Sequence, residues 1–253
     1  ANVPTELSLN SQPRLAGAHK VVIRPIEEEY SLYHYNWIQK NIAHVDKASN
    51  GKIGYIYIPD MGPEGLNEFS RYFYPQLDKE GLIIDDRANG GGNVSPMILE
   101  RLSREAYRLT MSRGSSLIGT VPDAVQVGPK VCLINKYSAS DGDLFPWGFH
   151  ALGLGKLIGT RTWGGIIGIS GPLPYMDGTD IRVPFFTSYD PKTGNWIVEN
   201  HGVDPDILID NDPIREWNGE DQQLDRAIEE VMKQLKERKP LPGVPAPRDW
   251  SHK

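Results

Sequence analysis

The sequence predicts an α/β fold, because short apolar runs alternate along the chain with segments that have the spacing of amphipathic helices. The apolar runs lie at 53–58, 81–85, 130–135 and 156–160, and the helical segments lie at about 65–77, 95–109 and 141–153. Strands that alternate with helices in this way are typical of an α/β domain. With 253 residues, the chain fits one large domain, or one domain with a fragment of another, and can bury a substantial core.

The N-terminal part precedes this alternating pattern. Residues 1–19 are polar, and we expect them to be irregular. Residues 21–26 have the composition of a strand, which Pro25 interrupts. From Tyr30 to Ala43, aromatic and aliphatic residues recur at roughly helical spacing, which predicts a connecting helix.

The helix expected at 95–109 has the clearest start signal. Ser95 has the side chain of an N-cap, and Pro96 suits the first helical position. Its apolar positions would form one buried face, made of Ile98, Leu99, Leu102, Ala106 and Leu109.

Beyond residue 163 the pattern changes. Glycine and proline punctuate strand and hairpin signals over 164–199. Apolar residues at helical spacing then follow Asp221 and predict an amphipathic helix; they are Leu224, Ala227, Ile228, Val231 and Leu235. The proline-rich tail at 240–253 is expected to be mobile.

Composition excludes several classes of protein. The net charge of −6 argues against nucleic acid as the principal partner. No run approaches the roughly 18 to 20 apolar residues that a membrane-spanning helix needs, so we expect no membrane partner. The single cysteine, Cys132, lies within an apolar run and is expected to be a buried thiol. One cysteine fits a reducing compartment such as the cytoplasm, and a periplasmic location stays open.

Two strand ends carry the residues that indicate chemistry. The run Val131–Ile134 leads into Asn-Lys-Tyr-Ser-Ala-Ser-Asp-Gly-Asp, which ends in an expected helix start. A serine at such a junction lies where free backbone N–H groups and the helix dipole can stabilise an oxyanion. Upstream, the run that ends at Asp85 leads into Asn89-Gly90-Gly91-Gly92, and glycines allow backbone amides to turn toward a substrate carbonyl.

Together with three further segments, these motifs resemble the C-terminal protease part of the tricorn-type branch of the tail-specific protease superfamily. The further segments are 51–61, 159–165 (Gly-Thr-Arg-Thr-Trp-Gly-Gly) and 199–206 (Glu-Asn-His-Gly-Val-Asp-Pro-Asp). The resemblance implies a crotonase/Clp-like spiral of ββα units. It also implies three parts: a remnant strand of a PDZ-like domain at 1–28, a serine protease catalytic domain at 29–238, and a tail at 239–253.

Residue by residue, the resemblance makes Ser140 the nucleophile. The backbone amides of Gly92 and Asp141 would form the oxyanion hole, and Glu199 would assist the general base. The lysine of the serine/lysine members is absent, because Gly165 stands 25 positions after Ser140. The tricorn-type histidine comes from a helical region before the PDZ-like domain, so we expect the base to lie upstream of this chain. His201, a neighbour of Glu199, is the intrachain alternative.

The remaining signals indicate no cofactor and no metal. Asp204, Asp206, Asp210 and Asp212 lack the glycine and the terminal glutamate of an EF-hand loop, so solvated loop acids are the favoured interpretation. The three glycines lack the lysine of a P-loop and the spacing of a dinucleotide fingerprint.

Three functions stay open at this point: a serine peptidase that acts on unfolded polypeptides or oligopeptides, a non-catalytic peptide-binding or assembly module, and a crotonase-like acyl-CoA enzyme. The resemblance also implies a ring-forming homo-oligomer, such as a hexamer. An acidic specificity pocket would draw on Glu100, Glu105 or Asp123, between which the sequence does not choose.

Overall fold

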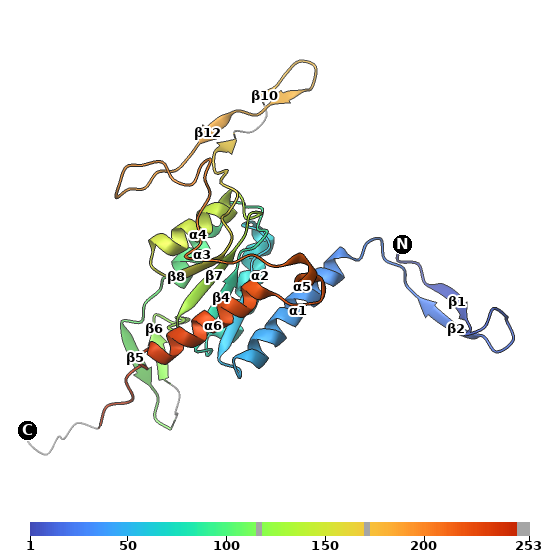
Figure 1. The fold of residues 1–253 in the computed structure, drawn as a ribbon, viewed down its shortest axis with the longest axis horizontal. Helices are drawn as coiled ribbons and strands as arrows, with labels where there is room; N and C mark the ends of the chain where they lie inside the picture. The colour runs from blue at the N-terminus through green and yellow to red at the C-terminus, as the bar shows by residue number, and fades with distance from the viewer. Residues whose placement is uncertain (115–117, 170–172, 247–253) are drawn as a thin grey trace, which may run out of the picture. The chain divides into compact units, whose positions relative to one another are not determined.

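The computed structural model describes residues 1–114, 118–169 and 173–246 (Figure 1). The chain divides into two compact units, Ala1–Asn41 and Ile42–Lys253, and each is described here by itself. Helix α1, Tyr30–Ala48, runs five residues beyond the expected end at Ala43 and passes from one unit to the next. Among the described helices, none has the length and the apolar character needed to cross a bilayer.

The first unit contains a β-hairpin that the sequence only half predicts. Strand β2, His19–Ile23, pairs in antiparallel register with β1, Thr5–Leu9. The expectation that residues 1–19 are irregular is therefore wrong over Thr5–Leu9. In this segment Leu7 and Leu9 alternate with polar residues, which is the period of a strand with two different faces. The strand expected at 21–26 ends at Ile23, two residues before Pro25, whose nitrogen cannot donate to a ladder.

The core of the second unit is a parallel sheet. Within the described residues it has five strands in the order β13-β8-β7-β4-β3. Their bounds are Ile53–Tyr57 (β3), Gly81–Asp85 (β4), Lys130–Ile134 (β7), Gly155–Gly159 (β8) and Ile207–Leu208 (β13). The four strands that the sequence predicts are confirmed to within one residue at either end, whereas β13 has two residues and gives no periodic signal. All five strands end at the same edge of the sheet.

Different helices cover the two faces of the sheet. Helices α2 (Pro63–Phe73), α3 (Ser95–Leu102) and α4 (Asp141–Ala151) contribute to one apolar cluster with alternate strand residues such as Ile84 and Cys132. A short 3₁₀ turn, Tyr74–Gln76, follows α2. Helix α6, Gln222–Glu237, covers the opposite face with Leu224, Ala227, Ile228 and Val231, and packs over β4, β7 and β8 (Figure 1). The α/β prediction is confirmed as a parallel sheet between two helical layers.

The helix expected at 95–109 is shorter than predicted. It ends at Leu102, and residues 108–111 form strand β5 (Arg108–Met111), which pairs with β6 (Ile118–Val121). Leu109 therefore faces a hairpin partner, Thr120, and does not extend the apolar face of α3. Val94 occupies the N-cap position, and Ser95 is the first helical residue, so the predicted N-cap is displaced by one position.

The described residues 168–169 and 173–186 contain short antiparallel ladders, as the hairpin signals indicate. Strand β9 (Gly168–Ile169) pairs with β12 (Pro184–Phe186), and β10 (Leu173–Pro174) pairs with β11 (Asp180–Ile181) (Figure 1). Large apolar side chains of this segment are exposed, among them Tyr175, Met176 and Phe185. Residues 170–172 of the expected hairpin region, and residues 247–253 of the expected mobile tail, lie outside the described residues.

Candidate active site

The turn between β7 and α4 carries two serines in different environments. Ser138 is fully buried, and its hydroxyl donates a 2.7 Å hydrogen bond to the carbonyl of Asp86. Ser140 is exposed and occupies the N-cap position of α4, with a φ of 57° that non-glycine residues seldom adopt. Among the described residues, its hydroxyl has no hydrogen-bond partner. Of the two, Ser140 is therefore the accessible hydroxyl.

The glycine turn after β4 approaches the end of β3 so closely that its shape requires glycine. Gly92 has a φ of 152°, and a Cβ placed on it would lie 2.0 Å from the carbonyl oxygen of Met61. Met61 donates its N–H to the carbonyl of Gly91 at 2.9 Å, and its own carbonyl accepts the N–H of Asn93 at 2.7 Å. The glycines thus allow two strand ends to lie backbone against backbone.

Asn89 joins the glycine turn to the serine turn. Its side chain is buried, accepts the N–H of Gly91 at 2.9 Å and donates to the carbonyl of Ile58 at 3.1 Å. Its backbone carbonyl accepts the N–H of Ala139 at 2.8 Å. In the sequence Asn89 looks like an ordinary turn residue, but its hydrogen bonds join the glycine turn to the serine turn.

Two backbone amides beside Ser140 are available to a ligand. A Cβ placed on Gly91 would lie 2.6 Å from the Cβ of Ser140 and 2.9 Å from the nitrogen of Asp141, so the two turns are in contact. The N–H of Gly91 is occupied by Asn89, whereas those of Gly92 and Asp141 donate to no other group in the described parts of the chain. The Asp141 amide also opens helix α4, where the backbone dipole favours negative charge.

The side chain of Asp141 has a structural task. It is buried and accepts hydrogen bonds from the backbone N–H, at 3.0 Å, and from the hydroxyl of Ser95, the first residue of α3. The carboxylate thereby binds the N-terminus of one helix to that of another, which leaves the backbone amide of Asp141 as its contribution to the site.

Two carboxylates hold the loop that faces the serine turn. Asp143, which is fully buried, accepts the N–H groups of Gly164 at 2.8 Å and Gly165 at 3.2 Å. Glu199 accepts those of Ile166 at 2.7 Å and Ile167 at 3.0 Å. Four consecutive amides, those of residues 164–167, are thus fixed by two acids, and among the described residues no hydrogen bond joins Glu199 to Ser140. Asp143 is missing from the predicted site residues, because an acid in the first turn of a helix is common.

Gly165 stands at the position where the resemblance noted above would place the lysine of serine/lysine members. A Cβ there would lie 2.1 Å from the ring of Trp163, and the backbone N–H of Trp163 donates to the carbonyl of Ser138 at 2.9 Å. The indole ring covers the glycine, so a longer side chain at this position would have to displace it. The packing of Trp163 on Gly165 therefore leaves no space for a lysine side chain unless the indole moves.

The histidines of the second unit that the structure describes are engaged elsewhere. His201 is 58% exposed and pairs with Asp204 at 2.8 Å, His150 pairs with Asp206 at 3.4 Å, and His44 pairs with Asp225 at 2.6 Å. His201 and Glu199 are neighbours in sequence, but the described structure gives them no hydrogen bond to each other. The sixth histidine, His252, lies outside the described residues.

A buried network of charges anchors the end of β4. Arg87, 7% exposed, makes ion pairs with Asp85 at 2.6 Å and with Asp221, the N-cap of α6, at 2.8 Å. The hydroxyl of Tyr55 donates to Asp85 at 2.7 Å. Burial acts to raise the pKa of Asp221, but Arg87 and the capping N–H of Leu224 outweigh it and lower that pKa. The network connects the strand that enters the glycine turn to the helix on the opposite face.

The aspartates considered as a cation site have partners within the protein. Asp204 pairs with Arg161, Asp206 accepts the N–H of Leu157, Asp210 accepts the N–H of Asn211, and Asp212 caps helix α5 (Pro213–Trp217). In the parts of the chain that the structure describes, no group of three or more His, Cys, Asp or Glu residues is arranged to hold a metal.

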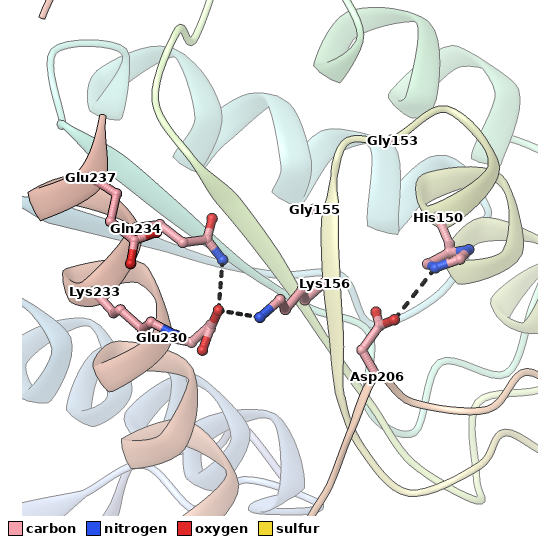
Figure 2. Close-up of a pocket in the computed structure, with 9 residues that line it drawn as sticks. All are labelled: His150, Gly153, Gly155, Lys156, Asp206, Glu230, Lys233, Gln234 and Glu237. Atoms are coloured by element: carbon pink, nitrogen blue, oxygen red, sulfur yellow. Dashed lines mark hydrogen bonds and ion pairs between the residues drawn. The ribbon is translucent and has the colours of Figure 1, made fainter. Parts of the chain in front are cut away.

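A depression lies at the opposite end of α4 from Ser140. It has a volume of about 360 Å³ and lies between the start of β8 and the C-terminal turns of α4 and α6 (Figure 2). Lys156 pairs there with Glu230 at 2.7 Å, and His150 with Asp206 at 3.4 Å. Because Ser140 opens α4 and His150 lies in its last turn, this pocket is separate from the serine turn.

Comparisons with known proteins give one consistent result. Residues 52–209 match Peptidase family S41. The Tricorn protease of Thermoplasma volcanium is 42% identical over 214 residues, which are 85% of this chain and 21% of that protein. Tricorn protease homolog 1 of Streptomyces coelicolor is 36% identical over 237 residues, 94% of this chain and 22% of that protein.

A solved structure extends the similarity to the fold. The crystal structure of the tricorn protease matches with a TM-score of 0.81 at 37% identity, over 93% of this chain and 23% of that chain. The present chain therefore spans about a fifth of the length of the curated relatives it matches. The residues that carry the match include both turns described above, since each lies within 52–209.

Proposed function

Because this chain belongs to peptidase family S41, we propose that it bears the nucleophile of a serine peptidase, which cleaves unfolded polypeptides or oligopeptides through an acyl-enzyme on Ser140. The observation that carries the proposal is the exposed Ser140 hydroxyl at the start of α4, beside two backbone amides without partners. Attack of the hydroxyl on a peptide carbonyl places negative charge on the carbonyl oxygen. The N–H groups of Gly92 and Asp141 would receive that charge.

We infer that the general base is not among the described residues. Each histidine of the second unit that the structure describes pairs with an aspartate remote from Ser140 in sequence, and Trp163 covers the position of a dyad lysine. We therefore place the base outside residues 1–253, in a region that precedes them in the whole protein. Glu199 would orient that base, since one of its carboxylate oxygens holds the loop at Ile166 and Ile167 and the other remains for the base.

The proposal extends to the organisation of the protein. Residues 1–28 would be the last part of a PDZ-like domain, 29–238 the catalytic domain with a crotonase/Clp-like spiral, and 239–253 a tail. Support comes from the parallel sheet and from the similarity to a tricorn protease structure. Assembly into a homo-oligomeric ring such as a hexamer belongs to the same proposal.

A fluorophosphonate probe applied to the whole protein tests the nucleophile. The probe should label Ser140, and Ser140→Ala should abolish labelling and lower peptide turnover on the order of 10⁴-fold or more. Ser138→Ala is the matched control, because it removes a buried hydroxyl two residues before Ser140. It should leave the site of labelling unchanged. Labelling at Ser138 would contradict the assignment.

The absent base favours a second candidate, a non-catalytic module that binds peptides on the same fold. The two functions differ in what residues 1–253 do when the upstream region is restored. A peptidase should gain at least about 10³-fold in turnover, because a serine without its base loses most of its nucleophilic advantage. Peptide binding without turnover in the restored protein would establish the module instead. Parent-like turnover of residues 1–253 alone, abolished by His201→Ala, would place the base on His201.

A further inference from the structure

One buried acid beneath the serine turn has no task in the chemistry described so far. Asp86 follows β4 directly and is fully buried. Neither of its carboxyl oxygens has a hydrogen-bond partner among the described residues. Buried polar groups are almost always paired, and an unpaired buried charge is costly. The side chain is therefore an exception that needs a physical explanation.

The groups that face Asp86 are mostly acids. Asp85 precedes it on β4, Asp141 and Asp143 approach from α4, and the thiol of Cys132 approaches from β7. Each of the three acids has its own donors: Asp85 has Arg87 and Tyr55, Asp141 has Ser95, and Asp143 has Gly164 and Gly165. The neighbouring cation, Arg87, is committed to Asp85 and Asp221. Among the described residues, a negative charge on Asp86 would have no cation of its own, and the one nearby group that favours the charge is the side chain of Asn89, whose amide donates to Ile58.

The backbone of Asp86 lies at the junction of the two turns. Its carbonyl accepts the hydroxyl of Ser138 at 2.7 Å and the N–H of Asn89 at 3.2 Å, and its N–H donates to Leu133 at 2.9 Å. Movement of Asp86 would thus shift both the serine turn and the glycine turn. A charge on Asp86 would repel Asp141 and Asp143, which lie in the first turn of α4.

We propose that Asp86 is a positioning residue that holds its proton in the folded protein, and that loss of this proton separates the serine turn from the glycine turn. Because the side chain of Asp86 is neutral, it packs beside the carboxyl groups of Asp85, Asp141 and Asp143 without charge repulsion. Burial, followed by the charges of Asp85, Asp143 and Asp141, raises the pKa of Asp86 well above its ordinary value of 3.8 and outweighs the side chain of Asn89, which acts to lower it. Activity at Ser140 would then fall at alkaline pH for a reason independent of the general base.

The pH dependence of unfolding tests the protonation without reference to activity. The unfolded chain releases the Asp86 proton above the ordinary pKa, whereas the folded chain keeps it, so the folded state binds more protons and stability falls as pH rises. This decrease in stability ends when the pH exceeds the pKa of Asp86 in the folded chain. Asp86→Asn removes this titration but keeps a neutral side chain of the same shape. The unfolding equilibrium constant of Asp86→Asn should therefore be smaller than that of the native chain, by a factor that grows about tenfold per pH unit over this range.

Two further measurements complete the experiment. Infrared difference spectra of the chain with isotope-labelled aspartate should show the carbonyl band of a protonated acid at neutral pH, absent in Asp86→Asn. The exposed acid Asp123 supplies the control Asp123→Asn, which should keep that band. The proposal would be overturned if the gain in stability of Asp86→Asn does not change with pH, or if the native chain lacks the band. If Asp86→Asn does not fold, the band in the native chain decides.

The positioning role rests on the proposed function and has its own readout. In the whole protein, the labelling rate of Ser140 should decline at alkaline pH in the native form and persist to higher pH in Asp86→Asn. Identical alkaline profiles would overturn the positioning role. If Ser140 reacts with the probe in neither form, the proposed function fails, while unfolding and infrared spectra still decide the state of Asp86.

Discussion

Helix α4 has charged groups at both ends, but the two ends neutralise them in different ways. At the Ser140 end, Asp141 and Asp143 are buried, and backbone N–H groups from other segments donate to both. At the His150 end, the ion pairs join side chains, of which His150 is 60% and Lys156 46% exposed (Figure 2). Backbone donors are fixed by the fold, whereas exposed side chains lose rotamer freedom when they pair.

The contrast indicates that the two ends serve different purposes. Carboxylates that accept backbone amides define where a turn lies, so the Ser140 end sets geometry. Exposed ion pairs such as His150–Asp206 depend on salt and contribute little to stability, so at the His150 end only the pair of Lys156 with the buried Glu230 should contribute appreciably. Substitutions that remove charge should consequently have larger effects at the Ser140 end.

The largest expected effect comes from the buried network beside the Ser140 end. Arg87→Met leaves Asp85 and Asp221 without their cation and should lower the free energy of unfolding by about 3–5 kcal/mol, as for other broken buried pairs. Urea denaturation followed by circular dichroism measures the loss. Arg161→Met, which breaks an exposed pair with Asp204, should cost less than about 1 kcal/mol. Similar losses in both variants would remove the distinction between buried and exposed pairs.

A direct comparison of the two ends uses one substitution at each. Asp143→Asn turns an NH₂ group toward one of the two amides that the acid accepts, and should cost about 1–3 kcal/mol of unfolding free energy. Asp206→Asn keeps an oxygen for the N–H of Leu157 and loses only the exposed pair with His150, so its cost should be smaller. Thermal unfolding of both variants under one condition ranks them. Equal costs would show that backbone acceptance does not distinguish the ends.

The prediction that depends on acid rather than on neutral pH concerns Glu230 at the His150 end. Burial acts to raise its pKa, but Lys156, Gln234 and Arg226 outweigh it and lower the pKa from 4.5 to about 2. Because the folded pKa is depressed, the stabilisation is complete above the unfolded pKa of 4.5 and is lost as pH falls through about 2. Glu230→Gln should therefore lose less stability than the native chain between pH 5 and pH 2. Parallel acid titrations of the two forms would refute this assignment.

Periodicity accounts for what the sequence could predict of the fold. The strands 53–57, 81–85 and 130–134 are fully buried apolar runs, and helix α6 has one continuous apolar face. Strand β5 was missed because Leu109 also fits the helical spacing of α3, and only its pairing with Thr120 decides between the two. Strand β1 was missed because a hairpin with two exposed faces has few apolar residues.

The candidate site was predictable where backbone chemistry leaves a pattern in the sequence. The glycine turn and the serine that opens α4 are visible as motifs, and the structure brings them into contact. The roles of Asp143 and Asp86 were not visible, because a carboxylate that accepts distant amides and one that has no partner look identical in sequence. Such differences depend on residues more than 20 positions away, as in the bond from Gly164 to Asp143.

The indole of Trp163 gives this site an optical reporter. Its backbone is bound to Ser138 in the serine turn, its ring covers Gly165, and 66% of the side chain is exposed to water. Tryptophan emission shifts to shorter wavelength when water leaves the ring. A peptide bound along the loop that Asp143 and Glu199 hold would therefore shift the emission maximum of Trp163. Occupancy beside Ser140 can thus be followed in the unmodified chain, with Trp163→Phe to assign the signal, even where no bond is cleaved.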